Sequence, residues 1–82
     1  MRVVKCGKQV RLPGGFYYTV RKARDDYPCF FCSSTIHKGT LYVEERFASV
    51  ARRYHYECFR KVVPHRLKVV ETPSGVVLCA EQ

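Results

Sequence analysis

Alternating apolar and polar residues predict short β-strands at the start of the chain. Residues 2–6 and 9–12 form two such segments, and a Pro-Gly-Gly turn at 13–15 leads into a third at 16–23. The third segment is rich in aromatic and β-branched residues, which favour strands. The N-terminal part of the chain is therefore predicted to be a small run of β-structure.

The predicted strand over residues 16–23 has two different faces, because successive side chains of a strand point in opposite directions. The apolar face carries Phe16, Tyr18 and Val20. The opposite face carries Tyr17, Thr19 and Arg21. We expect the first face to be buried, and the second to place an aromatic ring and a guanidinium side by side.

The second half of the chain predicts two hairpins and one short helix. A Lys-Gly turn at 38–39 precedes a strand over 40–47, and an Ala-Ser turn returns the chain as its partner. Residues 57–63 form a short helix that Pro64 ends. Residues 66–71 and 76–81 then pair around a turn containing Pro73 and Gly75. The predicted class is a small, β-rich α+β fold with β-hairpins and one short helix.

The length predicts a single domain over residues 1–82. We divide it into basic N-terminal strands (1–24), a zinc finger core (25–63) and a C-terminal β-hairpin (64–82). A chain of this size buries only about 60% of its unfolded surface, so its core alone is marginal. We therefore expect an additional stabilising element such as a metal ion.

The charge is strongly positive and unevenly distributed. Fifteen Lys and Arg against seven Asp and Glu give a formal net charge of +8, and the segment before Asp25 holds basic residues and no acid. Such a segment is typical of proteins that bind polyanions, with nucleic acid first and an anionic membrane surface second. The alternative is a solvated basic face that only maintains solubility.

Four residues have the spacing of a metal site. Cys29 and Cys32 are two residues apart, as are His55 and Cys58, with twenty-two residues between the pairs. Zinc prefers four tetrahedral nitrogen and sulfur ligands, and a two-residue gap lets both members of a pair reach one ion. A Cys3His set leaves no open position for water, so we predict one structural Zn²⁺ rather than a catalytic one.

Other interpretations of these residues stay open. Each Cys alone could be a small buried side chain, and His37 is a rival ligand to His55. We expect Phe30, Phe31 and Phe59 to pack around the metal and exclude water.

Cys6 and Cys79 fall in predicted strands near the two ends of the chain and could face each other in one sheet. In a reducing cell we expect free thiols there, whereas a hyperthermophilic source would favour a disulfide.

The segment "PCFFCSSTIHKGTLYVEERF" followed by "RRYHYECFRKV" resembles the poly(ADP-ribose) polymerase-type zinc finger. The resemblance covers residues 20–63. The ligand frame matches, and so do the following positions outside the first Cys pair: Ile36, Lys38, Gly39, Tyr54, His55, Cys58 and Phe59. The stretch between the ligand pairs is several residues shorter than in that family.

The resemblance implies a zinc-stabilised fold that binds DNA at nicks, ends or distorted duplex. Carried onto this sequence, it implies that Arg24 and either Arg52 or Arg53 contact phosphates. It also implies that Phe47 and Val50, near the hairpin tip, stack on exposed bases. ADP-ribosyl transfer is not implied, because no catalytic segment accompanies the finger.

We predict a zinc-binding protein that contacts nucleic acid, DNA before RNA, with Arg21, Lys22 and Arg24 as further contacts. The alternative is a zinc-stabilised adaptor that docks an acidic protein partner. No nucleophile or carboxylate pair accompanies His37 or His65, so we do not expect an enzyme or a small-molecule substrate. The sequence has no apolar run for a membrane span and no secretory signal, and we expect an intracellular protein.

Overall fold

The computed structural model describes residues 3–82 and confirms the predicted class, a small, β-rich α+β fold. Arg2, the first residue of the predicted N-terminal strand, lies outside the described residues. In the described part of the chain the elements are β1 (Val4–Gly7), β2 (Gln9–Leu12), β3 (Phe16–Lys22), β4 (Tyr27–Pro28), β5 (Thr35–Ile36), β6 (Leu41–Phe47), β7 (Val50–His55), α1 (Tyr56–Phe59), β8 (Leu67–Thr72) and β9 (Gly75–Glu81).

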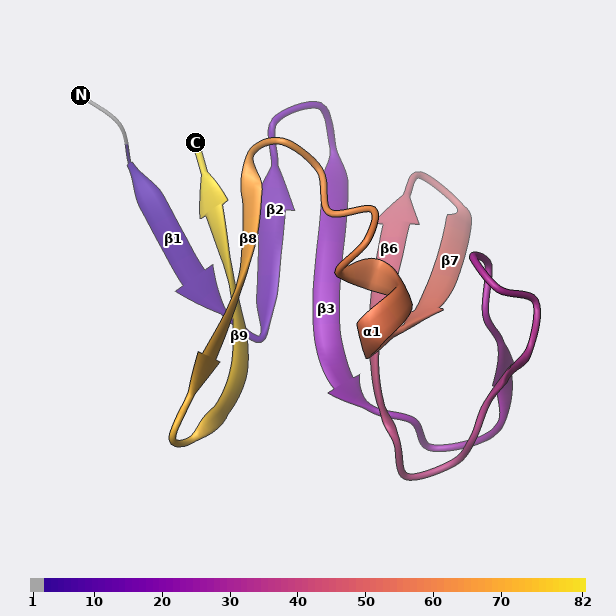
Figure 1. The fold of residues 1–82 in the computed structure, drawn as a ribbon. Coiled ribbons are helices and arrows are strands. Elements are labelled where there is room, and N and C mark those ends of the chain that lie inside the picture. Colours follow the sequence, from indigo (N-terminus) through magenta and orange to yellow (C-terminus); the bar gives the residue numbers. More distant parts are fainter. Residues whose placement is uncertain (1–2) are drawn as a thin grey trace.

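The strands form three antiparallel sheets. A three-stranded sheet has the order β1-β9-β8, and a four-stranded sheet has the order β2-β3-β6-β7. Strands β4 and β5 pair with each other in the long loop between β3 and β6, and Figure 1 shows this loop beside β7. Both predicted hairpins form, and the β6–β7 hairpin pairs Phe47 with Val50 across an Ala-Ser turn.

The main apolar cluster lies where α1 and strands of both larger sheets meet. It contains Val10, Leu12, Tyr18, Val20, Val43, Tyr54, Phe59, Leu67, Leu78 and Ala80. The Phe59 ring of α1 lies 5.7 Å from the ring of Tyr18 and 5.8 Å from that of Tyr54. The predicted apolar face of β3 is therefore confirmed, since Tyr18 and Val20 are buried and Phe16 packs against the cluster.

The opposite face of the four-stranded sheet, called the outer face below, is built by the alternate residues of each strand. From β2 to β7 it carries Gln9, Arg11, Tyr17, Thr19, Arg21, Tyr42, Glu44, Arg46, Ala51, Arg53 and His55. A smaller cluster of Ala23, Cys29, Ile36 and Tyr42 covers one end of this face. The other end, around Tyr17, is open to solvent, with Tyr17 38% exposed.

Two predictions of local structure are wrong in detail. The helix ends at Phe59 instead of residue 63, because Lys61 and Val62 donate to carbonyls three residues back, which tightens the chain into a narrower turn. Phe30 and Phe31 do not shield the predicted ligands. They are 59% and 46% exposed, and Phe59 alone of the three is buried.

The sequence left the state of Cys6 and Cys79 open, with free thiols expected in a reducing cell, and the structure joins them in a disulfide. Strand β1 pairs with β9 in a register that sets Cys6 directly opposite Cys79, so the two thiols meet across the strands. The bond closes a span of 73 residues and connects the first strand to the last.

Within residues 3–82 no helix has the length and apolar character that crossing a bilayer requires.

Candidate metal centre

The first ligand pair lies in a tight backbone turn between β4 and β5. The Cys29 amide donates to the Ser34 carbonyl, and the Ser33 amide donates back to the Cys29 carbonyl, both at 2.9 Å. Ser33 has a φ of 66°, a left-handed conformation that lets the chain reverse within a few residues. This turn directs the Cys29 and Cys32 sulfur atoms toward the same point.

The second pair lies where β7 passes into α1. His55 is the last residue of β7, and Cys58 is in the single turn of helix that follows. Two backbone contacts join this element to the cysteine turn: the Phe30 amide donates to the Arg53 carbonyl at 2.8 Å, and the His55 amide donates to the Cys29 sulfur at 3.4 Å. These contacts attach the cysteine turn to the end of β7, so that the two pairs lie side by side.

The four candidate ligand atoms lie within 4.8 Å of one another. His55 Nδ1 is 3.3 Å from Cys32 Sγ and 3.7 Å from Cys58 Sγ. Zinc bonds of about 2.3 Å to sulfur and about 2.0 Å to nitrogen would place tetrahedral ligand atoms about 3.6 Å apart. The spacing therefore suits one four-coordinate metal ion.

The His55 ring is oriented by a contact outside the cluster. Its Nε2 lies 2.9 Å from the Thr35 carbonyl oxygen, which can only accept a hydrogen bond. Nε2 therefore carries the proton, and Nδ1 directs its lone pair toward the three sulfur atoms. Metal-bound histidines usually have such a carbonyl or carboxylate partner on the second ring nitrogen.

The thiol pKa values differ strongly within the cluster. Hydrogen bonds from the Ser34 side chain and backbone lower the pKa of Cys32 to about 6. Burial and then the neighbouring Cys32 and Cys29 sulfurs raise the pKa of Cys58 to about 11. A second or third thiolate is thus disfavoured in this small space unless a cation neutralises it, which a divalent metal ion would do.

His37, the rival ligand, is not part of the cluster found in residues 3–82. It lies in the turn before β6, where its carbonyl accepts from the Thr40 amide and hydroxyl. The ligand set that the structure brings together is therefore the one predicted from the two matched spacings.

The predicted nucleic-acid contacts are divided between two sides of the four-stranded sheet. Arg21 and Arg53 lie on the outer face, and both reach the Glu44 carboxylate at 3.4 Å. Arg21 also donates to the Tyr42 hydroxyl at 3.0 Å, and the Arg53 guanidinium lies 4.3 Å from the Tyr27 ring centroid. These two arginines thus connect the strands at the end of the outer face nearest Cys29 and His55. This end is called the metal end below.

The other predicted contacts do not join them. Lys22 and Arg52 alternate with the outer-face residues of their strands, and Arg24 is exposed beyond the end of β3. Arg52 lies 3.7 Å from Glu45 and 4.6 Å from the Phe30 ring centroid. Phe47 and Val50 are 45% and 53% exposed at the hairpin tip, on the side of Arg52.

Sequence reasoning missed two arginines of the outer face, Arg11 and Arg46. In the sheet register both lie directly opposite Tyr17, one from β2 and one from β6. The Arg11 guanidinium lies 5.5 Å from the Tyr17 ring centroid, and Arg46 lies 3.5 Å from Glu44. The alternation of Arg11 with buried Val10 and Leu12 could have assigned its face, whereas its neighbour across the sheet required the register.

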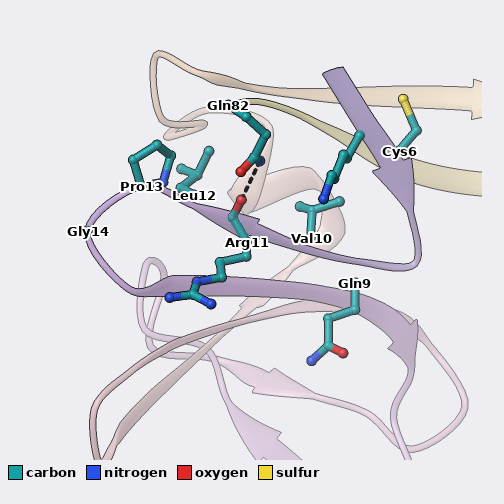
Figure 2. A pocket seen from close by; sticks show the side chains of 9 residues that line it. Cys6, Gln9, Val10, Arg11, Leu12, Pro13, Gly14 and Gln82 are labelled. Atoms are coloured by element: carbon teal, nitrogen blue, oxygen red, sulfur yellow. Dashed lines mark hydrogen bonds between the residues drawn. The ribbon is translucent and has the colours of Figure 1, made fainter. Parts of the chain in front are cut away.

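A cleft away from the candidate metal ligands lies between β1 and β2. It has a volume of about 600 Å³ and is lined by Lys5, Gln9 and Gln82 among others. Figure 2 shows the Gln82 amide donating to the Arg11 carbonyl, at 2.7 Å, while the Arg11 guanidinium points away from this contact. Arg11 also lines this cleft, and its guanidinium lies beside the Tyr17 ring of the outer face.

Comparisons with known protein families, with curated proteins and with solved structures give no significant match for this chain.

Proposed function

We propose that the protein is a zinc-stabilised nucleic-acid-binding module that uses the outer face of its four-stranded sheet. DNA is the primary expected ligand and RNA the second. Zinc is the metal that a Cys3His set with tetrahedral spacing fits best, and a closed set of four ligands gives it a structural role. The resemblance to poly(ADP-ribose) polymerase-type fingers agrees with this proposal.

The observation that carries the proposal is the charge of the outer face. Arg11, Arg21, Arg46 and Arg53 all lie on it, with Glu44 as the single acid among its described residues. Glu44 is 5% exposed and its carboxylate is shared by three of the arginines, so the surface left to solvent is cationic. Phosphate contacts by arginine supply most of the affinity of non-specific nucleic-acid binding.

The experiment is a salt titration of DNA binding by the metal-loaded chain. With four guanidiniums and one shared carboxylate we expect log K to fall with log salt concentration at a slope of about −3. Arg46→Ala, whose side chain is 54% exposed, should reduce the slope by about 1.

Arg66→Ala is the matched control for Arg46→Ala. Arg66 is also exposed but precedes β8, outside the four-stranded sheet, and should leave the slope unchanged. Equal slopes for all three proteins, or no binding at low salt, would contradict the proposal.

Arg21→Ala is a poor test of binding, although the sequence first pointed to that residue. Its guanidinium contacts both Tyr42 and Glu44, so its removal would also disturb the fold. Variants of Arg46 and Arg11 distinguish a loss of binding from a disturbed fold better than a variant of Arg21 does.

The adaptor hypothesis is the second candidate, and its acidic protein partner would compete for the same guanidiniums. An acidic peptide that binds with the same affinity as DNA of equal charge would favour it. We continue to predict that the protein is not an enzyme.

A further inference from the structure

We infer that the outer face takes single-stranded nucleic acid in preference to duplex, with Tyr17 as the surface on which an unpaired base stacks. This inference rests on the proposed function and names the form of its ligand. Three features carry it: the shape of the face, the position of Tyr17, and the distribution of charge around that ring.

The outer face has no element that could enter a groove of a duplex. The one helix in residues 3–82 is a single turn, and it lies on the opposite side of the sheet with Phe59 in the core. Four strands about 4.8 Å apart make a surface about 14 Å wide before side chains are added, which exceeds the major groove of about 12 Å. The face can lie along phosphates, but a duplex would keep its bases out of reach.

Tyr17 lies at the centre of the open end of this face. It is the middle member of the row Arg11, Tyr17 and Arg46 across β2, β3 and β6. Tyr17 is 38% exposed, and the Arg11 guanidinium lies 5.5 Å from its ring centroid. Within residues 3–82 its hydroxyl makes no hydrogen bond. An aromatic ring exposed between two cations is the arrangement on which unpaired bases stack.

The charges flank the ring across the strands and continue from it along the sheet toward one end. Arg21 and Arg53 are near the metal end, and Arg21 is four residues from Tyr17, about 13 Å along the strand. Glu44 lies between the two groups but is nearly buried beneath the arginines. A single strand could therefore keep its phosphates on the guanidiniums beside the ring and on those toward the metal end while one of its bases covers Tyr17.

Fluorescence anisotropy with the metal-loaded full chain tests this inference. The probes are oligothymidylate and oligouridylate of about twelve nucleotides and a DNA hairpin with a duplex of about the same length. We expect both single strands to bind about tenfold more tightly than the duplex.

Two variants of Tyr17 assign the effect to the ring. Tyr17→Leu should weaken single-strand binding by about tenfold and leave the salt slope and the duplex affinity unchanged, because it removes stacking and no charge. Tyr17→Phe should retain single-strand binding within about twofold, since the ring remains. Thermal melts and metal content of both variants, matching those of the parent, would establish that the fold is intact.

The outcomes distinguish this inference from the proposed function. Duplex binding as tight as single-strand binding, or a Tyr17→Leu variant that binds like the parent, would overturn the inference and leave the basic face as the binding site. Absence of binding to every probe at low salt would overturn the proposed function and this inference with it.

Discussion

The two ends of the molecule are held together by different means. One end consists of β1, β8, β9 and the inner side of the four-stranded sheet. It buries a continuous apolar cluster that includes Leu78 and Ala80, both fully buried. The metal end buries a much smaller cluster, and its strands β4 and β5 are two residues long. Apolar burial explains the first end, whereas the second would be held by ligand bonds if the candidate site binds its metal ion.

The candidate metal site lies next to the proposed binding surface. Tyr27, in the loop that the cysteine turn anchors, packs its ring 5.5 Å from Tyr42 of the outer face and lies under the Arg53 guanidinium. Loss of the metal would therefore release the partners that position Arg53, although Arg53 is not a ligand.

Metal removal should give the largest effect and should be confined at first to the metal end. Structural zinc sites contribute about 10 kcal/mol or more of apparent binding free energy, so chelation at neutral pH should unfold the loop between β3 and β6. In hydrogen exchange, the amides of Ser33 and Gly39, which donate to Cys29 and Ala23, should lose protection first.

The β8–β9 hairpin supplies the internal control for chelation. The Leu78 amide lies in β9, between strands that pair with it on both sides, and should stay protected longer than the amides of the metal end. Simultaneous loss of protection at both ends would contradict the distinction between them.

His37→Ala is the control for replacement of the candidate ligand His55, and it should keep the metal.

The disulfide should matter next, and at the opposite end. Replacing both Cys6 and Cys79 by Ser should lower the free energy of unfolding by about 2–4 kcal/mol, because the bond restrains a long span of the unfolded chain. Metal content should stay at that of the parent, since the ligands come from other segments. Urea denaturation together with metal analysis measures both quantities. A double variant that loses its metal would show that the two ends are not separate.

Glu44→Gln should give the smallest change in stability of these variants. It should lower the stability of the fold and raise the affinity for nucleic acid. The nearly buried carboxylate contacts three guanidiniums, and its loss should lower the free energy of unfolding by about 1–3 kcal/mol. The outer face becomes more positive, so nucleic-acid affinity should rise in anisotropy measurements.

Glu57→Gln is the charge-matched control for Glu44→Gln. Glu57 lies in α1 with its side chain 77% exposed, on the opposite side of the sheet. It should change neither stability nor affinity appreciably. Equal gains in affinity for both variants would mean that net charge, and not the outer face, controls binding.

The candidate metal ligands could be found in the sequence because the chemistry of each pair is local. A two-residue gap determines that Cys29 and Cys32 approach one point, and the same holds for His55 and Cys58. The strands were found for a similar reason, since alternation is visible within one segment. The apolar face of β3 and both hairpins followed from these local patterns.

The features that the sequence missed or left open depend on register and on contacts between distant segments. Arg11 and Arg46 join Tyr17 only through the pairing of three strands. The Cys6–Cys79 bond requires that β1 and β9 be neighbours with those residues opposite each other. Phe30 is exposed because its backbone pairs with β7 and leaves its ring at the sheet edge, beside Arg52. The sequence alone determines none of these neighbours.

A native mass spectrum of the chain purified without added metal, beside a denatured control, tests the central claim most directly. We predict the mass of the folded chain plus one zinc ion, lost on denaturation, with Cys58→Ala folded poorly and free of zinc. A spectrum whose low charge states show a folded chain without metal would contradict the account. The four residues would then be an ordinary part of the core.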